Sequence, residues 1–176
     1  MRMPRLLVEG AWYHVTARVN RQEMLFGPGE ARDLFMAFLA RVKKRYRFHI
    51  ANFCVMGNHV HLLIQPCANE NLSAIMRWLL GGFAKAYNRK HGLSGHFWGD
   101  RFHSRVLDGI RKIAIAFGYI DDNPVKAGLV SHISDWRHSG AWHAYMHTTS
   151  ILDWSEPWMV LFDRWRERTW GFAKAP

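Results

Sequence analysis

The order in which two hydrophobic periodicities follow one another limits the folds open to this chain. An alternating two-residue pattern covers residues 12–19, and a helical pattern covers residues 30–45. Two strand-like segments, one helical segment and a last strand-like segment follow, at 48–55, 59–65, 72–87 and 102–107. This βαββαβ order predicts a ferredoxin-like α+β fold, in which an antiparallel sheet carries both helices on one face.

A further helical segment comes after the last of these strands. Asp108 is expected to cap its start, because a short polar side chain can accept from the first free backbone N–H groups. The Asn123-Pro124 step is expected to end it, since a residue before proline is pushed out of helical geometry. Its apolar stripe is predicted to consist of Ile110, Ile113, Phe117 and Ile120.

Size and composition suit one globular domain. The chain has 176 residues, of which 49% are hydrophobic, enough to form a substantial core. We expect no membrane span and no signal peptide, and the two cysteines, which form no CxxC motif, favour a reducing, cytoplasmic setting. The tail is rich in Trp and His. We expect a domain over residues 1–145, and a C-terminal extension over residues 146–176 that packs on it.

The charge balance favours a polyanionic partner. Lys and Arg number 24 against 14 Asp and Glu, which gives a net charge of +10. A small basic domain of this kind usually meets nucleic acid, although a solvated basic surface without a partner is the alternative. Aromatic residues are interleaved with the cations in KAYNRKHGLSGHFWGDRFHSR, residues 85–105. That mixture favours nucleic acid, because phosphates attract cations and unstacked bases pack on rings.

Two histidines open the strand-like segment VMGNHVHLLI, residues 55–64. Side chains alternate along a strand, so His59 and His61 point to one side, while Val60 and Leu62 point to the core. Histidine is the commonest metal ligand among side chains, so the pair is a candidate metal site. Taken alone, the pair fits two structural histidines equally well.

Tyr119 and Asn123 lie one turn apart on a face of the last helical segment that is away from its apolar stripe. Ala116, one turn earlier, is small and leaves space for the tyrosine ring. Taken alone, this pair fits an ordinary helix surface. With the histidines it becomes a candidate site.

Four motifs together resemble one known family. YHVTARVNRQEMLF, VMGNHVHLLIQP, GHFWGDRFHS and YIDDNPVKAGLV are similar, in this order, to motifs of the IS200-type tyrosine transposases. The similarity is closer to their REP-associated relatives and covers residues 4–144. The family belongs to the HUH endonucleases, in which two histidines flank a hydrophobic residue. His59-Val60-His61 has that form.

The resemblance implies a role for each candidate residue. Tyr119 would be the catalytic nucleophile, and His59, His61 and Asn123 would hold Mg²⁺ or Mn²⁺. The family cleaves single-stranded DNA beside hairpin-forming, REP-like palindromes and leaves a 5′-phosphotyrosine link and a free 3′-OH, which permits rejoining. A phenol is a weak nucleophile at neutral pH, so a cation that polarises the phosphate suits this chemistry.

We predict that cations and aromatic residues near these motifs contact the DNA. The predicted DNA-binding residues are Arg18, Arg21, Lys85, Arg89, His96, Trp98, Arg101 and Arg105. The adjacent Asp121 and Asp122 depart from the usual aliphatic pattern of the family, and either lie near the metal or face solvent. The protein is expected to act as a monomer or a homodimer.

Three other functions compete with this interpretation. One is a DNA-hairpin binding protein that has lost cleavage, against which the intact Tyr, His and Asn set argues. Another is an HUH replication or conjugation nickase, but the chain is short and has no recognisable helicase. The third is a metal hydrolase for small molecules, which the basic surface and the aromatic loop disfavour.

Overall fold

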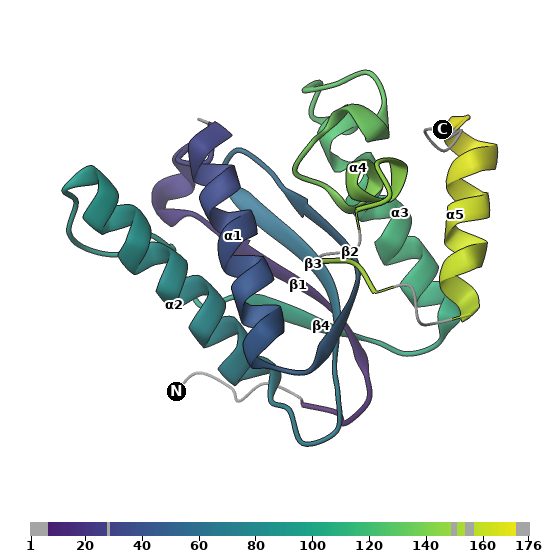
Figure 1. Cartoon of the computed structure of the whole chain (residues 1–176), viewed down its shortest axis with the longest axis horizontal. Coiled ribbons are helices and arrows are strands. Elements are labelled where there is room, and N and C mark those ends of the chain that lie inside the picture. Colours follow the sequence, from purple (N-terminus) through teal and green to yellow (C-terminus); the bar gives the residue numbers. More distant parts are fainter. Residues whose placement is uncertain (1–6, 28, 149–150, 154–156, 172–176) are drawn as a thin grey trace.

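A computed structural model describes residues 7–27, 29–148, 151–153 and 157–171 (Figure 1). Four antiparallel strands form one sheet in the order β2-β3-β1-β4. The strands are β1 (Trp12–Arg18), β2 (Phe48–Val55), β3 (His59–Pro66) and β4 (His103–Leu107). The helices are α1 (Gly29–Arg45), α2 (Leu72–His91), α3 (Ile110–Lys126), α4 (Gly140–Tyr145) and α5 (Pro157–Trp170), with short 3-10 turns η1 (Asn20–Gln22) and η2 (Ile133–Asp135). The predicted ferredoxin-like α+β fold is confirmed.

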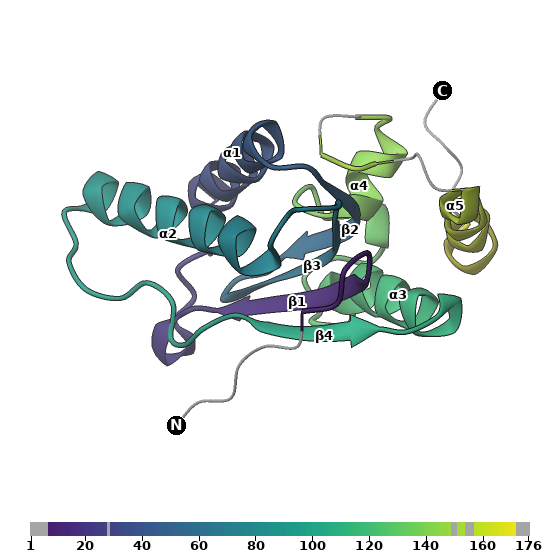
Figure 2. The same cartoon turned by 90° about the horizontal axis from the view of Figure 1, so that it is seen from below.

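The sheet separates two apolar layers. Helices α1 and α2 cover one face, which is the upper one in Figure 2, and Phe35 and Phe83 pack there against Leu62. Helix α3 covers part of the other face, where Phe117 and Ile120 lie among strand residues such as Leu63. Each strand therefore sends alternate side chains into different environments.

Alternation along β1 and β3 decides which side chains are available for chemistry. Val15 and Leu62 are fully buried on the α1–α2 side, as the sequence predicts. His14, Thr16 and His61 are immediate sequence neighbours of Val15 and Leu62, so they point to the opposite, α3 side of the sheet. The polar side chains of these two neighbouring strands thus gather under α3.

Two glycines within α2 do not interrupt it. The helix begins at the N-cap Asn71, whose Oδ1 accepts from the backbone N–H groups of Ser73 and Ala74. A Cβ atom at Gly82 would lie 2.9 Å from a ring carbon of Phe38, so this glycine permits the close approach of α1 and α2. The buried residues of α2 recur at helical spacing from Leu72 to Tyr87, over the helical segment that the sequence predicts.

Helix α3 differs from the prediction at both ends. Gly109, and not Asp108, is the N-cap residue, and it provides no side-chain cap. The helix also continues through Pro124 to Lys126. Near the C-terminal end the proline ring removes only one intrahelical hydrogen bond, and it is itself buried. Ile110 is 51% exposed, so the first residue of the predicted apolar stripe does not belong to the core.

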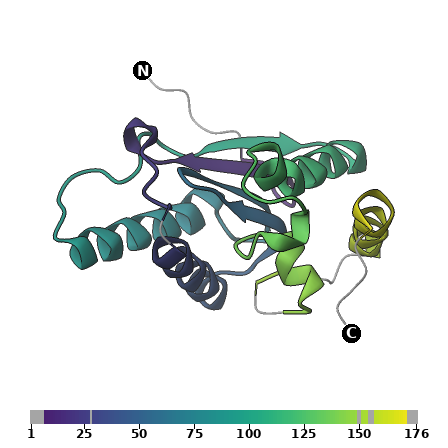
Figure 3. The same cartoon turned by 90° about the horizontal axis from the view of Figure 1, so that it is seen from above.

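The C-terminal part lies along one side of this core. Figures 1–3 all place α4 between α1 and α5. Phe162 and Trp165 of α5 pack in the apolar layer of α3, and the ring of Phe117 is 4.5 Å from that of Phe162. The division into a domain of residues 1–145 and a packed extension stays a prediction. Among the described residues, no helix combines the length and hydropathy needed to cross a bilayer.

Candidate nucleic-acid active site

The histidine pair lies at the start of β3, directly opposite β1. His59 pairs with Arg18 and His61 with Thr16 in the antiparallel register. The two imidazole rings are 4.8 Å apart between centroids and nearly perpendicular. Strand pairing therefore brings polar side chains from two segments of the chain to one patch under α3.

Both imidazoles are engaged through Nδ1. Nδ1 of His59 lies 2.7 Å from Oδ1 of Asn58. Nδ1 of His61 lies 2.9 Å from Nε2 of His14 and 3.2 Å from Oγ1 of Thr16. Nε2 of His61 is buried, and no side chain or backbone group in the described part of the chain forms a hydrogen bond with it. The arrangement leaves the Nε2 side of His61 for another ligand.

The surroundings keep these imidazoles neutral. Burial, with the nearby charges of His59, His14 and Arg18, lowers the pKa of His61 to about 3. Burial and then Arg18 also lower the pKa of His59. A neutral imidazole has a lone pair on one ring nitrogen, which is the form that binds a metal ion.

Tyr119 lies over the same patch. Its side chain is 47% exposed, and its ring meets the ring of His61 edge to face, with centroids 5.5 Å apart. The ring of His14 is 5.8 Å away. Phe117 and Ile120, buried against the sheet, fix the rotation of α3 that turns Tyr119 toward the histidines. The exposed ring of Tyr119 thus lies beside the buried imidazole of His61 and the half-buried imidazole of His14.

Asn123 follows Tyr119 by one helical turn. Its Nδ2 donates to the backbone carbonyl of Tyr119 at 2.6 Å. The donor end of the amide is therefore bound to its own helix. The acceptor end, Oδ1, forms no hydrogen bond with the described residues that would prevent it from binding a cation.

The direction of α3 follows from two contacts. Asn52, whose partner in the sheet is Leu63, donates to the carbonyl of Phe117 at 3.0 Å. Tyr119, further along the helix, lies against His61. The helix therefore advances toward the first residue of β3. Asn123 comes one turn after Tyr119, about 5.4 Å further along the axis. Its amide is therefore carried toward the start of β3, where the histidine pair lies.

This donor set fits a divalent cation. Two neutral imidazoles and an amide oxygen form a mixed N/O set that suits Mn²⁺ at least as well as Mg²⁺. The orphaned Nε2 of His61 is the observation that favours a bound cation there. In the described part of the chain, no three His, Cys, Asp or Glu side chains are grouped to hold a metal. The candidate set therefore includes the amide oxygen of Asn123.

Each of the two aspartates on α3 is paired with a basic side chain. Asp121 is 1% exposed, and its carboxylate accepts from Arg166 of α5 and from Asn52 of β2. Asp121 does not face solvent, so that alternative from the sequence is wrong for this residue. Asp122 forms an ion pair with Lys126 at 2.9 Å.

Four of the predicted DNA-binding cations border this patch. Arg18, Arg21 and Arg101 line one surface hollow of about 290 Å³ together with residues of η1. Arg105 is the partner of His14 in the register of β1 and β4, and its charge, after burial, lowers the pKa of His14. The basic groups therefore flank the histidine and tyrosine cluster on the β1–β4 side.

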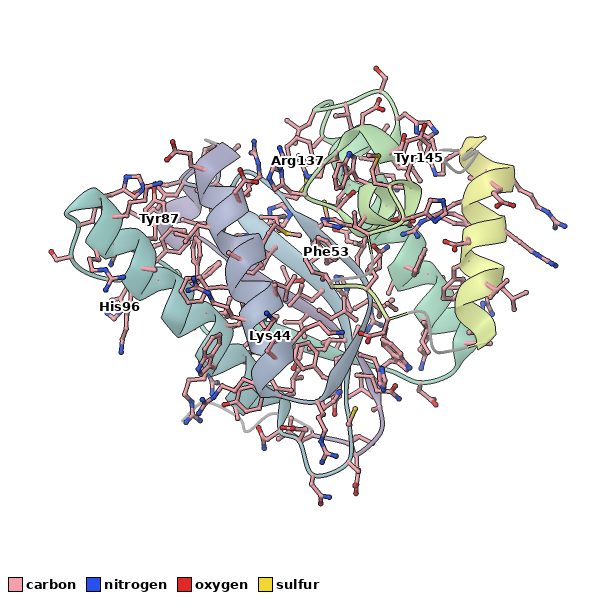
Figure 4. The ribbon with its side chains drawn as sticks, in the orientation of Figure 1. Lys44, Phe53, Tyr87, His96, Arg137 and Tyr145 are labelled. Atoms are coloured by element: carbon pink, nitrogen blue, oxygen red, sulfur yellow. The ribbon has the colours of Figure 1, made fainter. Side chains whose placement is uncertain are left out.

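The other four predicted DNA-binding residues lie elsewhere. Lys85 and Arg89 are exposed on α2, which covers the opposite face of the sheet. Figure 4 shows His96 near the far end of α2, where it is exposed. Trp98 is half-buried, and its Nε1 donates to the carbonyl of Leu80 at 2.9 Å. The structure does not bring these four to the candidate site, and their role stays a prediction.

Residues 7–123 match the protein family described as "Transposase IS200 like". This chain belongs to that family. A REP-associated tyrosine transposase of Escherichia coli strain K12 is 24% identical over 147 residues, which cover 83% of this chain and 85% of that protein. A Haemophilus influenzae protein, provisionally named a REP-associated tyrosine transposase, is 27% identical over 106 residues. That match covers 54% of this chain and 60% of the relative.

One solved structure has a similar fold. It is that of a REP-associated tyrosine transposase bound to a REP hairpin. The TM-score is 0.69 with 22% sequence identity, and the alignment covers 89% of this chain and 92% of the other. The IS200-like fold thus extends over most of the chain.

Two residues of this candidate site were missed by the sequence analysis. His14 contacts both His61 and Tyr119, and Thr16 contacts His61. Their only signal was that both lie on the polar face of the first strand. Which strand lies beside it, and in which register, was not visible from periodicity.

Proposed function

We propose that this chain is a metal-dependent single-stranded DNA endonuclease and transesterase of the transposase type. It cleaves and rejoins DNA beside hairpins. One observation carries the proposal: a single chain brings the exposed ring of Tyr119 within 5.5 Å of His61, a buried imidazole whose Nε2 has no partner among the described residues. A nucleophile beside a cation site is the arrangement that attack on a phosphodiester requires.

In the proposed reaction the Oη atom of Tyr119 attacks the scissile phosphorus. An Oη–P bond forms as the P–O3′ bond breaks. The phenol proton leaves to solvent, and the departing 3′ oxygen takes up a proton to become a 3′-OH. One phosphoester bond replaces another, so the reverse attack by a 3′-OH rejoins the strand without an external energy source.

The proposed cation, Mg²⁺ or Mn²⁺, would be held by Nε2 of His59 and His61 and by Oδ1 of Asn123. When bound, it would polarise the scissile phosphate and offset the charge that develops there. The chain itself orients these ligands: Asn58 engages His59, and β1 engages His61. All proposed groups belong to one chain, which suits a monomer, and a homodimer is the alternative.

The proposed substrate is single-stranded or hairpin DNA of the REP-like kind. The E. coli relative is named for REP association, and the solved relative was bound to a REP hairpin. In this chain, Arg18, Arg21 and Arg101 would hold phosphates beside the hollow that they line. Lys85, Arg89, His96 and Trp98 would contact a more distant part of the same DNA.

The proposed phosphate contacts predict a salt effect. Arg21→Ala should weaken hairpin binding several-fold and lower the slope of log affinity against log salt by about 1, because one counterion fewer is released. Arg164→Ala, which removes an exposed arginine of α5, serves as the control and should leave the slope unchanged. Fluorescence anisotropy at a series of salt concentrations measures both. Equal slopes for the two variants would show that Arg21 does not contact a DNA phosphate.

The proposed function is tested by a covalent adduct. Purified chain is mixed with single-stranded hairpin DNA from beside its own gene, labelled at the 3′ end so that the fragment bound to tyrosine is visible. On a denaturing gel we expect an adduct with Mn²⁺ and none with a chelator. His59→Ala and His61→Ala should each reduce it at least about 100-fold.

The identity of the linkage is the second readout. Digestion and mass spectrometry should find the nucleotide on Tyr119. If native gels show hairpin binding, but no adduct forms with either metal and any flanking sequence, the chain is a hairpin-binding protein that has lost cleavage.

A further inference from the structure

His14 occupies a position that the proposed reaction does not use. It projects from the middle of β1 and contacts both His61 and Tyr119. Its ring stacks on His61, with centroids 5.1 Å apart, and meets the edge of Tyr119 at 5.8 Å. It is partly buried, and Arg105 is its partner on β4.

The 2.9 Å contact between Nε2 of His14 and Nδ1 of His61 can be formed in two ways. If His14 donates, His61 carries its proton on Nε2, and a buried N–H is left without an acceptor among the described residues. If His61 donates, its buried Nε2 carries a lone pair instead. A buried donor without an acceptor is costly, whereas a lone pair at that position is what a cation requires.

The neighbouring histidine is fixed in the same way. Nδ2 of Asn58 donates to the carbonyl of Gln22 at 3.0 Å, so its Oδ1 faces His59 as an acceptor. Nδ1 of His59 must therefore carry the proton, which leaves the lone pair on Nε2. The same tautomer in both histidines directs both lone pairs away from their supporting residues.

We propose that His14 is a positioning residue of the cation site. Its Nε2 accepts the Nδ1–H of His61, with Thr16 Oγ1 as a second acceptor, and this holds His61 in the tautomer that presents Nε2 to the cation. Its ring also supports the ring of Tyr119. The inference rests on the proposed function, since it concerns the same cation.

Two variants separate the acceptor from the ring. His14→Phe keeps a ring against His61 and Tyr119 but removes the acceptor. His14→Gln loses the ring and places an amide oxygen near the position of Nε2. Affinity for Mn²⁺ alone, without DNA, is measured by the loss of the free-ion electron paramagnetic resonance signal. We expect 10- to 100-fold weaker binding for His14→Phe, and binding within about threefold of wild type for His14→Gln.

The tautomer itself is measured in the metal-free wild type. Two-bond ¹H–¹⁵N correlations of the imidazole rings distinguish a proton on Nδ1 from one on Nε2. We expect the proton of His61 on Nδ1. This readout needs neither DNA nor metal, and it applies even if His14→Phe fails to fold.

The outcomes separate the inference from the proposed function. If the wild type forms the adduct and binds Mn²⁺, but His61 carries its proton on Nε2 or His14→Phe binds Mn²⁺ normally, the positioning role is wrong and the function stands. A wild type with neither adduct nor Mn²⁺ binding overturns the function, and the positioning role with it. Weak binding that only His14→Gln restores supports the positioning role.

Discussion

Tyr119→Phe should reduce the covalent protein–DNA adduct by at least about 10³-fold and leave hairpin affinity within about twofold of wild type. The substitution removes only Oη, the atom that would form the new bond to phosphorus. Because the ring is 47% exposed and forms edge contacts with His61 and His14, phenylalanine retains those contacts. The adduct is quantified on a denaturing gel, and the affinity by anisotropy.

The matched control is another tyrosine of the chain. Tyr46, at the end of α1 on the opposite face of the sheet, is changed to phenylalanine in the same way, and Tyr46→Phe should form the adduct at the wild-type level. If instead Tyr119→Phe gives a wild-type adduct, the nucleophile is a different residue. Mass spectrometry of that adduct would then identify it.

Local periodicity was enough to predict most of the fold. Residues such as Val15 on a strand and Leu79 on a helix are buried where the spacing of apolar residues places them. The reason is physical: one face of each element must leave water, and the period of the element decides which side chains share that face. The same argument placed His59 and His61 on one side of β3.

Contacts between distant segments could not be predicted in this way. His14 meets His61 only because β1 pairs with β3 in one particular register, which is set by the whole sheet. Asp121 is bound by Arg166, which lies 45 residues away on α5, so no local pattern marked it as buried. Pro124 remains helical because its ring is buried. The local rule for a residue before proline does not include the free energy gained by that burial.

The distribution of charge was predicted only in part. A net charge of +10 indicates an anionic partner but does not tell which face of the sheet receives it. Arg18 and Arg101 lie beside the histidine patch, whereas Lys85 and Arg89 lie on α2, on the other side. The sheet therefore lies between Arg101 and the pair Lys85 and Arg89, although these three residues are close in sequence.

Arg166→Met should lower the free energy of unfolding by about 3–5 kcal/mol. Arg166 is fully buried, with Nε 2.8 Å from Oδ2 of Asp121 and Nη2 2.9 Å from Oδ1. Its guanidinium also lies 4.4 Å from the centre of the Phe117 ring. Methionine leaves the carboxylate of Asp121 buried and without its cation, which is more costly than the loss of the pair itself. Urea denaturation followed by tryptophan fluorescence measures the effect.

The double variant Arg166→Met with Asp121→Asn distinguishes a buried charge from lost packing. An amide at position 121 is neutral and can still meet Asn52, so the double variant should recover about half or more of the stability lost by Arg166→Met alone. A double variant less stable than Arg166→Met would show that packing of α5 dominates. Asp121 lies two residues from Tyr119 on α3, so the pair between α5 and α3 also supports the segment that carries the proposed nucleophile. Loss of the pair should therefore reduce adduct formation more than hairpin binding.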